Sequence, residues 1–442
     1  MAGIPRPENV STKVQQVAKL AKEAPEMAFT SLSHHIDLEF LHEAYRRTRK
    51  DGAVGVDGQS ADEYAVELDT NLESLLNRFK SGTYKAPPVK RVHIPKGDGK
   101  KTRPIGIPTF EDKVLQRATV MILEAIYEQD FMDCSYGFRP GRSALQAVEA
   151  LRDGLMDMHG GWVLEVDIQD FFGSLEFGHL RSFLDQRVKD GVIRRTIDKW
   201  LKAGVMENGQ ITRPDAGSPQ GGVVSPILAS VYLHEVMDKW FAGTVKPRLR
   251  GQAFLVRYCD DMVMVFESEE DARRVMAVLP KRFGKYGLTL HPEKTRLVPF
   301  KQPPTKGGGK GERTGTFDFL GFCHHWGKSR KGNWVVKRKT SDDRFRRAVR
   351  SITEWCQRNR HEPVRDQRQT LGLKLRGHYG YYGITGNYAA LSRFYQCVQD
   401  AWFKWLNRRD QGRHVTWQKF VDVLIPSLPL PRVVHSVYAA RP

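Results

Sequence analysis

Two adjacent carboxylates between two apolar runs constrain this chain more than any other feature of its sequence. Residues 254–256 are Phe-Leu-Val, residues 262–266 are Met-Val-Met-Val-Phe, and the polar stretch between them ends in Tyr-Cys-Asp-Asp at 258–261. Two β-rich runs around a short polar tip predict a β-hairpin. Asp260 and Asp261 at this tip repel each other unless a cation lies between them, and such hard oxygen ligands suit Mg²⁺.

A solvated turn is the competing interpretation, because Asp-Asp pairs are common on turns. The chain contains a second pair, Asp342-Asp343, at the start of a basic helical segment. There the pair is predicted to cap the helix and to favour its positive N-terminal end. A pair alone therefore does not predict a metal site, and a third carboxylate in a matching context is needed.

Asp167 is that third carboxylate. It follows the apolar run Trp162–Val166, which predicts a buried strand. A carboxylate at the end of a buried strand costs free energy unless something pairs with it. Two strand ends that carry Asp can meet and share two metal ions, and ions about 4 Å apart stabilise the attacking and leaving oxygens of a phosphoryl displacement. The alternative for Asp167 is a strand-end turn, or an N-cap for the segment that starts near Leu175.

The charge of the chain is concentrated in its last third. The whole chain has a formal net charge of +19 and a pI near 9.7, so an anionic partner is expected. Residues 301–442 contain 28 Lys and Arg but only 10 Asp and Glu, whereas the two kinds of charge almost balance over residues 1–300. A catalytic body with a basic, nucleic-acid-binding appendage fits this distribution better than a basic face that only aids solubility.

The cysteines and the hydropathy exclude several classes of protein. The five cysteines have no Cys-x-x-Cys spacing, which excludes the usual zinc-site patterns and indicates a reducing compartment. No run approaches the 18 or so apolar residues of a membrane span, and the N-terminus has no apolar core of a secretory signal. We therefore expect a cytoplasmic protein; the sequence does not indicate its oligomeric state.

Eight segments in a fixed order resemble the reverse transcriptases encoded by group II introns. The last of them resembles the maturase region of that family, and the resemblance covers roughly residues 30 to 410. So many segments in the family's order are far more specific than a single motif. They are Arg103–Pro108, Tyr136–Ser143, the strand before Asp167, Gly217–Gly222, Tyr258–Asp261, Leu290–Thr295, Phe317–Phe322 and Gly377–Tyr382.

This resemblance implies an α+β fold: a right-hand polymerase, with fingers and a palm built on antiparallel sheet, followed by an all-helical thumb and maturase region. The predicted divisions are an N-terminal helical extension, fingers and palm, a helical RNA-binding region that is basic and helical from about residue 335, and a short basic tail. Their ranges are 1–60, 61–325, 335–409 and 410–442.

The resemblance also assigns residues to RNA-directed DNA synthesis. Asp167 and Asp260 would hold two Mg²⁺ ions, for which Mn²⁺ could substitute, assisted by Asp261 and by the carbonyl of Ile168. Lys294 would protonate the departing pyrophosphate as a general acid. The residues implied to contact the incoming deoxynucleotide are Lys96, Arg103, Phe172 and Gln220.

Some of these residues have structural alternatives. Arg103 suits a triphosphate because its fork matches phosphate oxygens. Phe172 would exclude a 2′-hydroxyl beneath the sugar, or would simply pack beside Phe171. Gln220 belongs to a segment that would pack against the nascent base pair, or would form an ordinary entry turn to a helix capped by Ser225 and begun by Pro226.

The basic third is predicted to bind RNA. Its implied RNA-binding residues are Arg344, Arg347, Arg350, Tyr379 and Tyr381, although the tyrosines would equally serve as packing at a helix junction. The implied partners are an RNA template, a structured intron RNA whose splicing the protein assists, a DNA primer or target, and deoxynucleotides. The resemblance also implies a role in intron mobility.

Two departures from the family pattern are visible. Cys259 replaces the family's usual alanine, a change that the site should tolerate because the cysteine side chain is small and mostly apolar. The sequence ends about 30 residues after the maturase-like region without a Cys- and His-bearing nuclease, so we expect synthesis to be primed without cleavage of the second strand. The alternatives are a host-adopted or CRISPR- or defence-associated reverse transcriptase, and a splicing factor that binds RNA with an idle palm.

Overall fold

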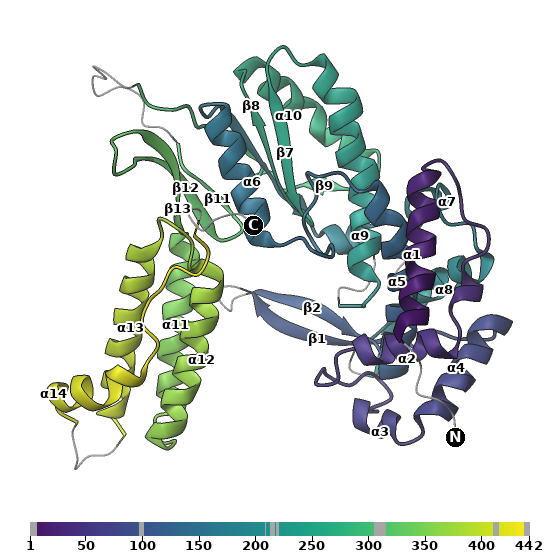
Figure 1. Cartoon of the computed structure of the whole chain (residues 1–442), viewed down its shortest axis with the longest axis horizontal. Coiled ribbons are helices and arrows are strands. Elements are labelled where there is room, and N and C mark those ends of the chain that lie inside the picture. The colour runs from purple at the N-terminus through teal and green to yellow at the C-terminus, as the bar shows by residue number, and fades with distance from the viewer. Residues whose placement is uncertain are drawn as a thin grey trace. The chain divides into compact units, whose positions relative to one another are not determined.

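The computed structural model of the chain describes residues 7–96, 101–207, 209–212, 217, 221–304, 315–409 and 415–436. It divides into two compact units, which are described separately (Figure 1). Unit 1 contains the chain up to Ala147 together with Trp162–Leu297, and unit 2 contains Val148–Gly161 and the chain from Val298. The predicted α+β class with antiparallel sheets is confirmed, while the four predicted divisions of the chain stay predictions.

The central sheet of unit 1 has the strand order β10-β3-β8-β7. Its strands are β3 (Trp162–Val166), β7 (Ala253–Tyr258), β8 (Asp261–Phe266) and β10 (Arg296–Pro299). The predicted hairpin and buried strand are confirmed, since β7 pairs with β8 and β8 pairs with β3, both antiparallel. Their Val and Met side chains and Phe266 are buried, and helix α10 (Glu269–Gly284) packs against β3 and β8 (Figure 1).

A second sheet in unit 1 has the order β2-β1-β5-β6. Strands β1 (Val89–Lys96) and β2 (Lys101–Ile107) form a basic antiparallel hairpin, whose tip at 97–100 lies outside the described residues. Strands β5 (Val205–Glu207) and β6 (Gln210–Thr212) extend it, and a separate short sheet pairs β4 (Ile168–Gln169) with β9 (Thr289–Leu290). The glycine Gly221, at φ +116°, lies against this hairpin, because a Cβ there would be 2.6 Å from the Gly106 oxygen.

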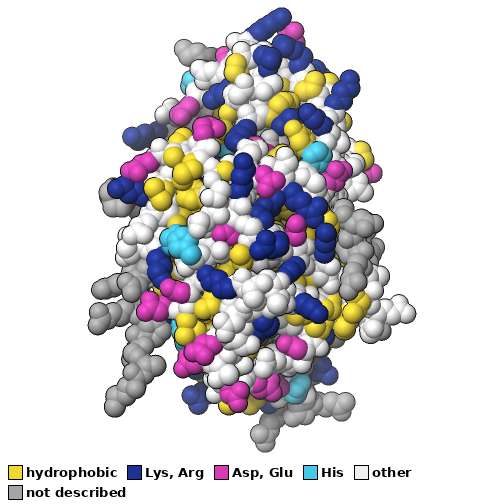
Figure 2. All heavy atoms as spheres, turned by 90° about the vertical axis from the view of Figure 1, so that its right-hand side faces the viewer, with side chains coloured by type: hydrophobic (Ala, Val, Ile, Leu, Met, Phe, Trp, Pro, Cys, Tyr) yellow, Lys and Arg dark blue, Asp and Glu magenta, His cyan; other side chains and the backbone are white. Residues whose placement is uncertain are grey.

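The helical core of unit 1 is built around α5 (Phe110–Asp130), most of whose side chains are buried. Helices α1 (Pro7–Glu23) and α2 (Leu38–Arg47) pack against it (Figure 1). On the face that carries α1, Lys and Arg side chains lie among Asp and Glu, as the balanced charge of residues 1–300 predicts (Figure 2). The other helices of unit 1 are α3 (Ala61–Ala65), α4 (Leu68–Ser81), α7 (Phe177–Asp185), α8 (Gly191–Lys202) and α9 (Ser225–Leu233). Helix α6 (Ala144–Asp157) begins in unit 1, and its residues from Val148 onward belong to unit 2.

Unit 2 combines a three-stranded antiparallel sheet with a helical bundle. The strands are β11 (Phe317–Phe319), β12 (Phe322–Lys328) and β13 (Trp334–Thr340), and helices α11, α12 and α13 lie side by side (Figure 1). The helices span Asp342–Arg358, Val364–Tyr382 and Tyr388–Leu406, followed by the single turn α14 (Trp417–Lys419). Together they bury one apolar cluster that includes Leu371, Leu375 and Trp402.

Two local predictions for unit 2 are wrong. The expectation of helix from about 335 fails because residues 334–340 alternate and pair along their length with β12, so that the helix begins at 342. The Asp342-Asp343 pair lies in the first turn of α11, where it favours the helix dipole, but Ser341 occupies the cap position. Within the described ranges, no helix is both long enough and apolar enough to span a membrane.

Candidate active site

The two adjacent carboxylates lie at a tight turn and differ in how deeply they are buried. Because Tyr258 pairs with Asp261, only Cys259 and Asp260 connect β7 to β8. Cys259 has φ +59°, the left-handed conformation that two-residue hairpin turns require. Asp260 is half-buried at the tip, whereas Asp261 begins β8 and is exposed. The two carboxylates of this turn therefore lie in different environments. Such a difference often lets paired carboxylates take different roles.

Asp167 lies at the same end of the sheet. Strand β3 ends where Val166 pairs with Met262, one residue from the hairpin turn, and Asp167 follows directly. The segment 291–295 holds it in place: the amide of His291 donates to the Asp167 oxygen (2.8 Å), and the Nζ of Lys294 lies 3.1 Å from Asp167 Oδ2. The structure thus brings Asp167 and Lys294 together.

Asp167 and Asp260 are also neighbours, because Asp167 follows Val166, whose cross-strand partner Met262 lies two residues from Asp260. Burial raises the pKa of Asp260, and the charge of Asp167 raises it further, while Arg103 on β2 and Arg257 on β7 oppose this shift. Arg103 is exposed, so its guanidinium is available to an anionic ligand. This end of the sheet therefore collects two carboxylates, a lysine and an arginine from four separate segments of the chain.

These residues fit a metal ion that is shared with a substrate. Among the residues that the structure describes, no three His, Cys, Asp or Glu side chains gather closely enough to form a complete metal cage. Mg²⁺ does not need one, because it keeps several waters and is commonly bound by one or two carboxylates plus substrate phosphates. The predicted backbone ligand belongs to Ile168, which follows Asp167 and pairs with Leu290. Two repelling carboxylates beside this backbone are a suitable donor set.

The predicted nucleotide contacts are only partly visible. Phe172 lies in the short turn Phe171–Ser174 and is partly buried, with its ring edge-on to Phe171 at 5.3 Å, so both interpretations of this residue remain. Gly217, which begins the Gly-Ser-Pro-Gln-Gly motif, donates to the Leu175 oxygen at 2.9 Å and lies against Gly173. The side chain of Lys96 and the whole of Gln220 lie outside the described residues.

Sequence reasoning missed the buried ion pair that supports the hairpin turn. Arg257 and Asp238 are completely buried, and Arg257 Nε donates to Asp238 Oδ1 at 2.8 Å. The same guanidinium donates to Ser135 Oγ (2.9 Å) and to the Cys259 oxygen (3.1 Å), so it holds the turn directly. Burial alone would raise the pKa of Asp238, but the charge and hydrogen bonds of Arg257 lower it. The sequence did contain a signal for this pair. Each of two apolar runs, 253–258 and 236–238, holds one charged residue, and a charge in an apolar run needs a partner.

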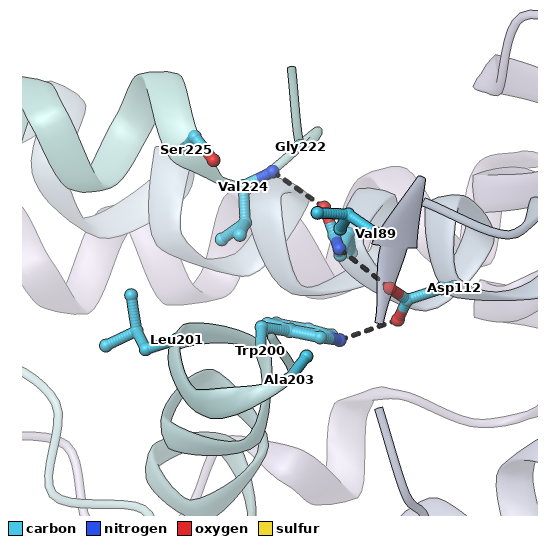
Figure 3. Close-up of a pocket in the computed structure, with 9 residues that line it drawn as sticks. Val89, Asp112, Trp200, Leu201, Ala203, Gly222, Val224 and Ser225 are labelled. Carbon is cyan, nitrogen blue, oxygen red and sulfur yellow. Dashed lines mark hydrogen bonds between the residues drawn. The ribbon is translucent and has the colours of Figure 1, made fainter. Parts of the chain in front are cut away.

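A second buried network holds the chain that follows the Gly-Ser-Pro-Gln-Gly motif. Asp112 accepts hydrogen bonds from the Tyr84 hydroxyl, from Trp200 Nε1 (2.6 Å) and from Gln116 Nε2 (3.0 Å). Gln116 Oε1 in turn accepts the amide of Val224 at 3.2 Å (Figure 3). The network borders a cavity of about 10 Å³, close to the size that one water needs.

This network also corrects the predicted start of helix α9. Ser225 was expected to be the N-cap with Pro226 first, but the helix begins at Ser225 and Val224 holds the cap position. No side chain caps the helix there, while Gln116 Oε1 accepts the amide of Val224 itself. The start of α9 is therefore fixed from α5, far away in the sequence.

Asp112→Asn is expected to loosen Val224 without unfolding the protein. The asparagine amide would face Gln116 Nε2, so one N–H between residue 112 and Val224 would lose its acceptor at a cost of about 1–3 kcal/mol. Amide hydrogen exchange at 221–225 should therefore accelerate about tenfold or more. The exposed Asp62→Asn is the control, and unchanged exchange in Asp112→Asn would contradict the role of this network.

Asp112 also makes the free energy of unfolding depend on pH. Burial raises the pKa of Asp112 to about 6. The folded protein therefore binds this proton more tightly than the unfolded chain, and ionisation lowers stability as the pH rises from about 4 to 6. Asp112→Asn should lack this contribution.

The predicted RNA-binding residues lie in unit 2. Arg344 and Arg350 are exposed on α11, and Arg347 is half-buried and paired with Asp343. Tyr379 is only 1% exposed and belongs to the bundle core, so base stacking is wrong for this residue and helix packing is correct. Tyr381 is half-buried, stacks on Phe322 and donates to the Leu320 oxygen at 2.8 Å.

Comparisons with known proteins converge on one family. The model of the family "Reverse transcriptase (RNA-dependent DNA polymerase)" matches residues 94–324. The chain is 32% identical over 287 residues to the group II intron-encoded protein LtrA of Lactococcus lactis subsp. cremoris, covering 61% of this chain and 46% of LtrA. It is 30% identical over 354 residues to protein YkfC of Escherichia coli K12, covering 71% of this chain and 88% of YkfC.

A plant relative shares a shorter region. The nuclear intron maturase 2 of Arabidopsis thaliana mitochondria is 29% identical over 176 residues, which cover 31% of this chain and 24% of that protein. The chain thus spans about half the length of LtrA and most of the length of YkfC.

Proposed function

Because the chain belongs to the reverse transcriptase family and is homologous to group II intron-encoded proteins, we propose that it is an RNA-directed DNA polymerase of the group II intron type. The observation that carries this proposal is the meeting of Asp167, Asp260 and Lys294 at one end of the central sheet. Three segments separated by tens of residues supply these side chains, and two carboxylates beside a lysine suit a nucleotidyl-transfer site.

The proposed reaction joins the 3′-oxygen of a primer to the α-phosphorus of a deoxynucleotide and breaks the bond between that phosphorus and the pyrophosphate oxygen. Asp167 and Asp260, assisted by Asp261 and the Ile168 carbonyl, would hold the divalent cations. Two bound Mg²⁺ ions, or Mn²⁺ in their place, would ionise the 3′-hydroxyl and stabilise the leaving oxygen.

The remaining residues bind and orient the nucleotide. The fork of Arg103 receives triphosphate oxygens beside Asp260. Lys294, held near the site by its contact with Asp167, moves to the pyrophosphate and donates a proton to its leaving oxygen. Phe172 lies beneath the sugar and rejects a 2′-hydroxyl, and Lys96 and Gln220 complete the nucleotide site.

The basic third grips RNA in this proposal. Arg344, Arg347 and Arg350 lie on one helix of a region that holds nearly all of the excess positive charge, which favours salt-dependent binding to a nucleic acid. Its partners are an RNA template, a DNA primer or target and a structured intron RNA whose splicing and mobility the protein serves. All five cysteines are free thiols, and we place the protein in the reducing cytoplasm.

Primer extension tests this proposal. The wild-type protein should copy an RNA template into DNA from deoxynucleotides with Mg²⁺, and the Asp260→Ala/Asp261→Ala variant should make no product while binding RNA normally. The Asp342→Ala/Asp343→Ala variant is the matched control, because it removes an acidic pair from α11 and should keep wild-type synthesis. RNA binding without synthesis by the wild type would instead favour a splicing factor with an idle palm.

A further inference from the structure

Strained backbone gathers around the proposed active site. Among the described residues, five that are not glycine have a positive φ, and three of them are Phe138 (56°), Asp170 (43°) and Cys259 (59°). Asp170 follows the Asp167 strand and Cys259 forms the hairpin turn. A bulky residue in this conformation is a true outlier, and such strain collects where surrounding structure imposes it for a function. Phe138 is the bulkiest of the three.

The neighbours of Phe138 are fixed on both sides. Tyr136 donates to the Arg257 oxygen and Arg257 donates to the Cys134 oxygen, both at 2.8 Å, so that this segment runs beside β7. Gly137 fits against the hairpin turn, because a Cβ there would lie 2.3 Å from Cys259 Sγ and 2.4 Å from Cys259 N. The chain just before Phe138 is therefore locked to the catalytic turn.

Arg139, on the other side, is 8% exposed. Its guanidinium donates to the oxygens of Met132 and Ser135, both at 2.8 Å, and to both carboxylate oxygens of Glu128 at 3.1–3.2 Å. With both flanks anchored, the backbone at residue 138 must turn sharply, and the turn directs its side chain outward.

The ring of Phe138 gains little from the protein in return. It is 59% exposed, and it lies beside the ring of Tyr258, whose centroid is 6.5 Å away at an interplanar angle of 38°. A phenylalanine kept only for packing would be buried, and a turn kept only for its shape would carry glycine or asparagine. An exposed ring on a strained turn beside Asp260 is instead suited to contact a ligand there.

We propose that Phe138 and Tyr258 form an aromatic platform that contacts the terminal nucleotides of the primer–template duplex and positions the primer end at Asp167 and Asp260. This inference rests on the proposed function and adds a nucleotide-binding surface to it. The contact is non-covalent, and it needs no base preference because every base has a π-face.

Phe138→Asn separates this role from a structural one. Asparagine tolerates the left-handed conformation and lacks the ring, so the variant should melt at or above the wild-type temperature. It should nevertheless bind a primer–template duplex about tenfold more weakly, in line with the loss of one base–aromatic contact. Phe138→Tyr keeps the ring and should bind like the wild type.

The binding assay uses a DNA primer that ends in a dideoxynucleotide, annealed to RNA, so no synthesis can occur. 2-Aminopurine is placed either at the primer end or at the facing template position. Quenching by the wild type and by Phe138→Tyr, but not by Phe138→Asn, supports the platform, and the responding position identifies the strand.

Equal affinity and equal quenching in Phe138→Asn would overturn the proposed platform. If the wild type made no DNA yet quenched the probe through Phe138, the proposed polymerase would fail and the platform would stand.

Discussion

Asp260→Asn is expected to lower the rate of RNA-templated DNA synthesis by at least about a thousandfold while raising the melting temperature of the metal-free protein. The two effects have one cause. Burial and the charge of Asp167 raise the pKa of Asp260, so the ionised carboxylate is held at a cost in stability. The amide removes this cost, and it also removes the charge that a metal ion requires.

The pH dependence of this effect has a definite sign. The folded protein binds the Asp260 proton more tightly than the unfolded chain, so the wild type loses stability as the pH rises from about 4 through the higher folded pKa. Asp260→Asn should lack this loss and should exceed the wild type most clearly at neutral pH. Thermal unfolding in EDTA at pH 5 and pH 8 measures the difference.

Asp261→Asn is the matched control for stability, because Asp261 is exposed and its replacement should change the melting temperature little. Wild-type synthesis by Asp260→Asn would exclude this residue from the chemistry. A lower melting temperature at neutral pH would show instead that Asp260 stabilises the metal-free turn.

Arg257→Met is expected to cause the largest loss of stability. It leaves Asp238 buried without its partner, a change that typically lowers the free energy of unfolding by about 3–5 kcal/mol. It also removes the donors to Ser135 and to the Cys259 oxygen, so the catalytic turn loses its support. The deficit should shrink as the pH falls, because protonation neutralises the stranded Asp238 carboxylate.

Urea unfolding measures this loss, with two further variants as controls. Arg257→Met/Asp238→Leu removes both charges and should recover much of the stability, since apolar replacement of a buried pair is often neutral. Arg273→Met breaks an exposed pair with Glu269 and should change the free energy of unfolding by less than about 1 kcal/mol. A similarly small change in Arg257→Met would contradict the supporting role of the buried pair.

The parts of the site that the sequence predicted are those with strong local patterns. The hairpin of β7 and β8 and the buried strand β3 follow from short apolar runs with a polar end, and each carries its aspartate at the predicted place. The meeting of Asp167 with Asp260 required a further argument, that like charges on strand ends need a shared cation.

What the sequence could not predict depends on contacts between distant segments. A charged residue in an apolar run indicates that Arg257 needs a partner, but nothing local indicates that the partner is Asp238, or that Gln116 accepts the Val224 amide before α9. The left-handed turn at Phe138 arises only because Gly137 and Arg139 are both fixed by other elements. The sequence around Tyr379 does not tell whether this tyrosine is exposed or buried, and it is the packing of the helical bundle that buries it.

Single-nucleotide addition by the wild-type protein tests the central claim most directly. A DNA primer annealed to an RNA template is mixed with protein, Mg²⁺ and one deoxynucleotide, and the primer length and released pyrophosphate are followed together. The account predicts that only the nucleotide complementary to the RNA base is added, with one pyrophosphate per addition, and that EDTA stops the reaction. A protein that binds the duplex yet adds no nucleotide with either Mg²⁺ or Mn²⁺ would contradict it.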